Sequence, residues 1–231
     1  MTADTGQLAL AEQYHRIALD LAHEAEDRTV YSITMRAMSA LGLRLGWLSF
    51  ASQLAETAVE TAGPGAPPSV ASYLLIQRAV TRARACQRSA ALTDLLRAED
   101  KHHTDAEQTI SFAHYPSAAL HFQRAETFLA LGMYPEAIGA LRRSARLRDS
   151  ATQHRSFAIT QARLAETLIL TGQLEPACHH WGRFLDHHAH VRSVLIRRAL
   201  HTLHQQLRPY QRHPIAADVL ARARLSRGRS Y

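Results

Sequence analysis

Histidine and cysteine side chains gather between residues 178 and 190 and could ligate a metal ion. On a helix, His180 and His187 would share a face, and His187 and His190 are three residues apart. A zinc site needs three or four ligands that converge, and no second cluster in the sequence supplies the rest. The two cysteines, Cys86 and Cys178, also lack metal-ligand spacing. We therefore expect ordinary surface histidines on a helix and its exit turn, with no metal and no cofactor.

Motifs for catalysis are absent from the sequence. It contains no Gly-rich phosphate loop, no Gly-x-Ser-x-Gly motif and no His-Glu-x-x-His motif. Isolated His, Asp and Ser residues could converge in space, but their spacing does not suggest it. The prediction is that the protein is not an enzyme.

The positive charge of the chain is concentrated at its C-terminal end. Residues 192–231 contain nine arginines and one acid, Asp218, which gives +8, while the whole chain carries +7. One interpretation is a solvated helical face with a frayed tail, and the other is contact with nucleic acid or an acidic partner. The arginines that would make the contact with nucleic acid are Arg192, Arg197, Arg198, Arg208 and Arg212.

An internal repeat indicates the elements that position these side chains. Residues 124–137 read RAETFLALGMYPEA and residues 164–177 read LAETLILTGQLEPA, so the two segments align without gaps. A small residue follows each turn, with spacings of 40, 40, 46 and 40 residues. Such spacing is typical of a solenoid of helix pairs, and the tetratricopeptide unit is about 34 residues long. The small residues are Ala11, Ala51, Ala91, Ala137 and Ala177.

The fold class predicted from this pattern is all-α: a right-handed, tetratricopeptide-like α-solenoid of about 11 helices in a single domain, 1–231. An apolar fraction of 46% with few glycines and prolines agrees with packed helices. Glycine after a helix can adopt positive φ and ends the helix, and residues 63–68 form a further break. The predicted helices are 6–25, 29–45, 48–62, 68–84, 88–100, 116–131, 134–147, 153–171, 174–188, 191–207 and 214–226. The repeat units are 6–28, 29–64, 68–102, 116–150 and 153–190, with capping helices in 191–226.

Several segments together resemble a known family. They are the run from His114 to Gly132, the segment Ala162–Thr167 followed by Gly172 and Trp181, the tripeptide Val191-Arg-Ser193, and the closing Leu-Arg-Pro209. These resemble the tetratricopeptide sensor region of actinobacterial, Streptomyces-type transcriptional regulators. Those proteins usually carry an N-terminal helix-turn-helix domain, and no such motif is recognisable upstream of the repeats here. The resemblance implies a regulatory sensor that works through ligand or partner binding.

In such solenoids the first helix of each pair lines the concave face. The predicted groove is apolar with a few polar anchors, as a site for a peptide or small molecule would be. Glu126 and Glu166 occupy the same repeat position and could hold a cationic or amide group. The alternative is that they pair with nearby arginines such as Arg124 and Arg163, or stay solvated. The residues that we expect to line the groove are Arg36, Arg44, Tyr73, Gln77, Phe122, Glu126 and Glu166.

Three functions follow as hypotheses. The first is a non-enzymatic regulatory or sensor protein that binds a peptide, small molecule or partner protein in its groove. The second is a nucleic-acid-associated protein that uses the C-terminal arginines. The third is a scaffold that oligomerises through its N-terminal face, for example as a homodimer. This face is expected to be uncovered because the first repeat unit begins at its turn and has only its second helix. No apolar run of 18 residues and no signal peptide appear, so we expect no membrane contact and a cytoplasmic location.

Overall fold

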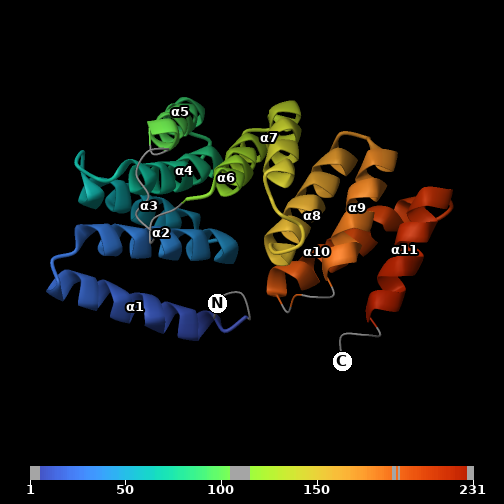
Figure 1. Cartoon of the computed structure of the whole chain (residues 1–231), viewed down its shortest axis with the longest axis horizontal. Helices are drawn as coiled ribbons and strands as arrows, with labels where there is room; N and C mark the ends of the chain where they lie inside the picture. Colours follow the sequence, from blue (N-terminus) through green and yellow to red (C-terminus); the bar gives the residue numbers. More distant parts are fainter. Residues whose placement is uncertain (1–5, 105–114, 189–190, 192, 228–231) are drawn as a thin grey trace. The chain divides into compact units, whose positions relative to one another are not determined.

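The chain folds into α-helices throughout the part that can be described. The computed structural model describes residues 6–104, 115–188, 191 and 193–227 (Figure 1). These residues contain no strand, which confirms the all-helical prediction. In chain order the elements are α1 (Leu8–Glu24), α2 (Arg28–Leu45), α3 (Leu48–Ala62), α4 (Pro68–Arg84), α5 (Arg88–Thr104), α6 (Ser117–Ala130), α7 (Tyr134–Arg146), α8 (His154–Leu170), α9 (Leu174–His188), α10 (Val194–Leu207), the 3-10 turn η2 (Arg208–Tyr210) and α11 (Pro214–Arg227).

The ends of the helices follow the turn residues of the sequence. Gly46 and Gly172 adopt φ of 81° and 75° directly after α2 and in the turn after α8, a left-handed conformation that costs glycine nothing. Pro68 opens α4, where a missing N–H is harmless. Such positions explain why nearly every predicted helix lies within one or two residues of the observed one.

Two helix ends differ from the prediction by more than that. The helix predicted over 88–100 continues to Thr104, because no glycine or proline interrupts it. The helix predicted to begin at 191 begins at Val194. Ser193 precedes it with extended backbone, and its hydroxyl accepts a hydrogen bond from the N–H of Leu195. This N-cap fixes the start of α10.

The helices group into two compact units. The N-terminal unit comprises the described part of Gln7–Met133 and holds α1 to α6, while the C-terminal unit comprises Gly6 with the described part of Tyr134–Tyr231 and holds α7 to α11. The boundary separates α6 from α7, so the repeat predicted over 116–150 contributes one helix to each unit. Its pairing, and the single domain 1–231, stay predictions.

In the N-terminal unit, α4 packs against α2, α3, α5 and α6, and α1 packs on α2. The small residues of the repeat lie at these crossings. Ala51 and Ala91 are fully buried, and Ala11 is 2% exposed. With only a methyl group there, the helices approach closely, and larger residues such as Leu74 and Ile76 fill the remaining space. The solenoid packing expected from the spacing of the alanines is confirmed within this unit.

In the C-terminal unit, α8 and α9 form the closest pair, α10 packs on α8, and α11 packs on α9. Trp181 and Phe184 are fully buried, with their ring centroids 5.5 Å apart in an edge-to-face arrangement. Each large buried side chain stabilises the fold by about 1.5–3 kcal/mol. These two aromatic residues therefore belong to the core of this unit.

Candidate functional site

Arg36 and Tyr73 form the most distinctive contact among the predicted groove residues. Arg36 comes from α2 and Tyr73 from α4, and the guanidinium carbon lies 4.0 Å from the ring centroid. Arg36 is only 9% exposed, and its Nε is buried without a hydrogen-bond partner. Within the described residues no carboxylate forms an ion pair with it. The result is a nearly buried cation held by an aromatic face and not neutralised.

Aromatic side chains extend this contact along α4 and toward the start of α6. The ring of Tyr73 meets the ring of Tyr115 edge-on, with centroids 5.0 Å apart. Tyr115 is 8% exposed and also contacts the ring of His102 at 6.1 Å. His102 in turn lies 2.8 Å from the hydroxyl of Ser117. The ring that lies against the guanidinium of Arg36 is therefore itself held in place by a second aromatic ring.

Gln77, one turn further along α4, is fixed within the core. It is 2% exposed, and its Nε2 donates to the hydroxyl of Ser39 at 3.2 Å. The Ser39 hydroxyl donates to the carbonyl of Ala51 at 2.7 Å. Gln77 therefore links α4 to α2 and has a structural role rather than an exposed one.

Phe122 and Glu126 lie half-buried on α6 of the same unit. Glu126 forms an ion pair with Arg84 of α4 at 3.6 Å, whereas Arg124 pairs with Glu99 at 2.6 Å. An arginine therefore pairs with Glu126, as one alternative predicted, but it comes from a neighbouring helix.

The remaining predicted groove residues do not join this cluster. Arg44 lies near the end of α2 and is exposed. Glu166 belongs to α8 in the C-terminal unit and accepts a hydrogen bond from Arg163 at 3.0 Å. Because Glu126 and Glu166 belong to different units, their proximity stays a prediction.

A buried charge cluster joins α3, α4 and α5, and sequence reasoning missed it. Arg78 donates two hydrogen bonds to the carboxylate of Asp94, both 2.8 Å, and Arg82 donates a third at 2.8 Å. Glu56 pairs with both arginines at 2.8–3.1 Å. Asp94 is fully buried. Burial lowers the pKa of Arg78, but the hydrogen bonds and charge of Asp94 and then Glu56 outweigh it and raise that pKa.

One signal in the sequence could have revealed this cluster. Asp94 lies three residues after Ala91 and four before Ala98, in the middle of an apolar helical stripe. A carboxylate in such a stripe needs a cation from the facing helix. Arg78 and Arg82, one turn apart on the preceding helix, are the matching pair.

Two histidines of α9, His180 and His187, contact side chains of α8. The Nδ1 atoms of His187 and His154 lie 3.2 Å apart. Nδ1 of His180 lies 2.7 Å from Oε1 of Gln161, and burial, then the charges of His179, Arg183 and Arg142, lower the pKa of His180 to about 4. Among the described residues no three His, Cys, Asp or Glu side chains could hold a metal together. His190 lies outside the described residues.

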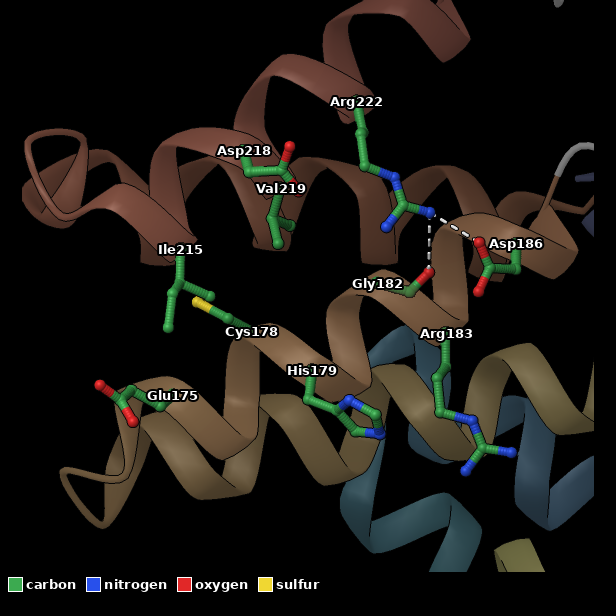
Figure 2. Close-up of a pocket in the computed structure, with 10 residues that line it drawn as sticks. All are labelled: Glu175, Cys178, His179, Gly182, Arg183, Asp186, Ile215, Asp218, Val219 and Arg222. Carbon is green, nitrogen blue, oxygen red and sulfur yellow. Dashed lines mark hydrogen bonds and ion pairs between the residues drawn. The ribbon is translucent and has the colours of Figure 1, made fainter.

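A pocket of about 420 Å³ lies between α9 and α11 (Figure 2). At one end Arg222 donates to the carboxylate of Asp186 at 2.6 Å and to the carbonyl of Gly182 at 3.4 Å. A Cβ on Gly182 would come within 3.3 Å of the same guanidinium. Cys178 lines the floor beside Ile215, and burial, then the charge of Glu175, raise the pKa of its thiol. The pocket is open, and Arg222, one of the two arginines that line it, is already paired with Asp186.

The N-terminal helix presents an apolar stripe to solvent. Ala11 and Ala22 are buried, whereas Tyr14, Ile17 and Leu21 are 55%, 53% and 60% exposed. Helix α1 therefore covers α2 with one face and leaves another uncovered. Whether a second copy covers that face stays a prediction.

Four of the arginines predicted to contact nucleic acid lie in α10, in η2 or in the turn after η2. Arg197, Arg198, Arg208 and Arg212 are all exposed, and Arg192 lies outside the described residues. In the part of the chain that the structure describes, no helix is both long enough and apolar enough to cross a membrane.

Comparison with known proteins places the fold. No protein-family model matches the chain, and no curated protein matches it. Among solved structures, BtubC (BKLC) from P. vanneervenii superimposes with a TM-score of 0.65 at 16% identity, over 97% of this chain and 92% of that one. A Podosopora anserina protein of the kinesin light chain type, with nearly identical TPR-like repeats, gives 0.59 at 16% identity, over 85% and 95%. At this identity the likeness establishes the tetratricopeptide-like fold and nothing finer.

Proposed function

We propose that this protein is a non-enzymatic interaction module whose N-terminal unit binds an acidic segment of a partner protein at Arg36 and Tyr73. The tetratricopeptide-like fold supports a role in protein interaction or scaffolding, since its helix pairs form extended binding surfaces. Arg36 and Tyr73 supply a cation and an aromatic face for such a segment.

The observation that carries the proposal is the unpaired guanidinium of Arg36. A nearly buried charge without a counter-ion is costly, and an incoming carboxylate would remove that cost. Arginine also presents a planar fork that fits a carboxylate with two parallel hydrogen bonds. Tyr73 holds the fork from one side, so little conformational freedom is lost when the anion binds.

The test is a selection of random dodecapeptides on the purified full chain. We expect the enriched peptides to contain Asp or Glu, and their affinity for the Arg36→Met variant to fall at least about tenfold, the scale of one charge-assisted contact. Arg28→Met removes an exposed charge from the same helix and should leave the affinity unchanged. Circular dichroism verifies that both variants are folded. Enriched peptides without acidic residues, or equal affinity for the Arg36 variant, would overturn the proposal.

The finer role of regulatory sensor is part of the same proposal. As a sensor, the protein would bind at Arg36 either an acidic segment of a regulatory protein or a small acidic molecule. Native mass analysis of the purified protein distinguishes these ligands, because a co-purified small molecule adds a few hundred daltons that denaturation removes. A bare mass together with selected acidic peptides points to the protein partner.

A further inference from the structure

Helix α10 carries a basic face that the proposed function does not use. Its buried residues Ile196, Ala199, Leu203 and Leu207 recur every three or four positions and face the protein. This stripe turns the opposite side of the helix to solvent. Arg197 and Arg198 are exposed on that side, and Arg208 is the first residue after α10, where η2 begins.

The charge of this face is not neutralised by the protein. Residues 187–217 contain no Asp and no Glu. Among the described residues, no carboxylate pairs with Arg197, Arg198, Arg208 or Arg212, although other exposed arginines of the same unit, such as Arg222, have such a partner. Four like charges without counter-ions create a local positive potential that attracts a polyanion.

An exposed aromatic residue follows α10 in the chain, between two of these arginines. Tyr210 is 40% exposed and stands in the turn between Arg208 and Arg212. The backbone holds this turn, because the N–H of Gln211 donates to the carbonyl of Arg208 and the N–H of His213 donates to that of Tyr210. An ordered tyrosine between two free arginines offers a flat surface for a base and two cations for the adjoining phosphates.

We propose that α10 and η2 bind single-stranded nucleic acid. Arg197, Arg198, Arg208 and Arg212 contact backbone phosphates, and Tyr210 stacks against a base. The stretch from Arg197 to Arg208 covers about 16 Å along the helix axis at 1.5 Å per residue, a reach of a few nucleotides. An acidic protein would satisfy the arginines equally well but would leave Tyr210 without a role, so the aromatic ring favours nucleic acid.

The first experiment measures binding of a fluorescent dT12 oligonucleotide to the full chain by anisotropy over a salt series. Four phosphate contacts predict a slope of about −2.8 for log K against log salt concentration, at about −0.7 per contact on a single strand. Arg208→Ala with Arg212→Ala should reduce the slope by about 1.4. Arg142→Ala with Arg146→Ala removes the same charge from exposed positions on α7 and should change little. Equal losses in both pairs would overturn the proposal, because binding would then follow net charge alone.

The second experiment isolates the base. Tyr210→Ala should weaken dT12 binding by about fivefold or more while leaving heparin binding unchanged, since heparin offers sulfates but no base to stack. If Tyr210→Ala binds both ligands like the wild type, or loses affinity for both equally, the nucleic-acid assignment is overturned. Either result would favour a general polyanion or an acidic protein as the ligand. The Arg36→Met variant should bind dT12 like the wild type, so this proposal and the peptide-binding proposal can fail separately.

Discussion

Cys86 occupies a turn position that the neighbouring repeats give to glycine. Its φ is 60°, and Gly46, Gly132 and Gly172 adopt the same left-handed conformation after their helices. A side chain with a Cβ pays about 1–2 kcal/mol for that conformation. The cost is tolerated here because the turn between α4 and α5 is held by the packing of both helices.

Replacing Cys86 with glycine should therefore stabilise the N-terminal unit. We expect the free energy of unfolding to rise by about 0.5–1 kcal/mol, because the relief of strain outweighs the added freedom of glycine in the unfolded chain. Urea denaturation followed by circular dichroism measures it. Gly46→Ala is the matched control. It has φ of 81° and no atom within 4 Å of a new Cβ, so it should lower the stability by about 1 kcal/mol. A destabilised Cys86→Gly variant would contradict the argument.

His180 predicts a pH dependence of stability in the C-terminal unit. Its pKa in the folded protein is lowered to about 4, mainly by burial, against an ordinary value of 6.5. The unfolded chain therefore binds a proton that the folded chain refuses, and stability falls as the pH drops from about 6.5 to about 4. The loss from this residue stays below the roughly 3 kcal/mol of the full shift, because solvent screens a side chain that is only partly buried.

Thermal unfolding of His180→Gln across this pH range is the test. The wild type should lose more stability than the variant between pH 7 and pH 4. Above pH 7 neither state changes its protonation at residue 180, so the stabilities of the two proteins should change in parallel there. His201→Gln, an exposed histidine of α10, should keep the wild-type profile. Parallel profiles for the wild type and His180→Gln would show that His180 does not titrate in this way.

At the scale of elements, the helices were predictable because residues close in the sequence determine where each helix begins and ends. Glycine at Gly46 or Gly172 and proline at Pro68 or Pro214 act within a turn of the chain, so the sequence alone places them. Ala51 and Ala91 were equally readable, since only a small residue permits close crossing of the helices. The ends that moved, at 104 and 194, lacked such a marker or had a serine cap in its place.

The contacts between helices were not predictable in the same way. Glu126 pairs with Arg84 and not with Arg124, and His187 meets His154, a residue 33 positions earlier. Such partners depend on the exact rotation of each helix about its axis. The repeat pattern predicts which face of a helix is buried, but not which side chains on neighbouring helices meet. The stacking of Arg36 on Tyr73 is a partial exception, because both had been assigned to the same face.

The cluster that joins α3, α4 and α5 predicts a large effect of Asp94. In Asp94→Asn the buried guanidiniums lose their principal counter-ion, and we expect a loss of about 3–5 kcal/mol in the free energy of unfolding. Asp100→Asn, at an exposed position on the same helix, should cost less than about 0.5 kcal/mol. Chemical denaturation compares the two. Similar small effects would mean that water replaces the carboxylate.

At the scale of the whole molecule, each unit contains one tryptophan, and the two differ in exposure. Trp47 in the N-terminal unit is 55% exposed and Trp181 in the C-terminal unit is fully buried. Acrylamide should quench the emission of Trp47 and spare that of Trp181. In Trp47→Phe the remaining emission should be shifted to the blue and resist quenching. A quenchable Trp181 would contradict the core described for that unit.

The buried charges of α3, α4 and α5 also affect which helices of this chain pair with one another during folding. Repeats that share the same alanines and glycine turns resemble one another, so helices of different repeats can exchange places during folding. If α5 docks on any helix that lacks arginines at the positions of Arg78 and Arg82, the carboxylate of Asp94 is buried without a counter-ion, at a cost of several kcal/mol. The cluster thus favours the pairing of α5 with α4 within a repetitive chain, and it penalises any arrangement that separates these two helices.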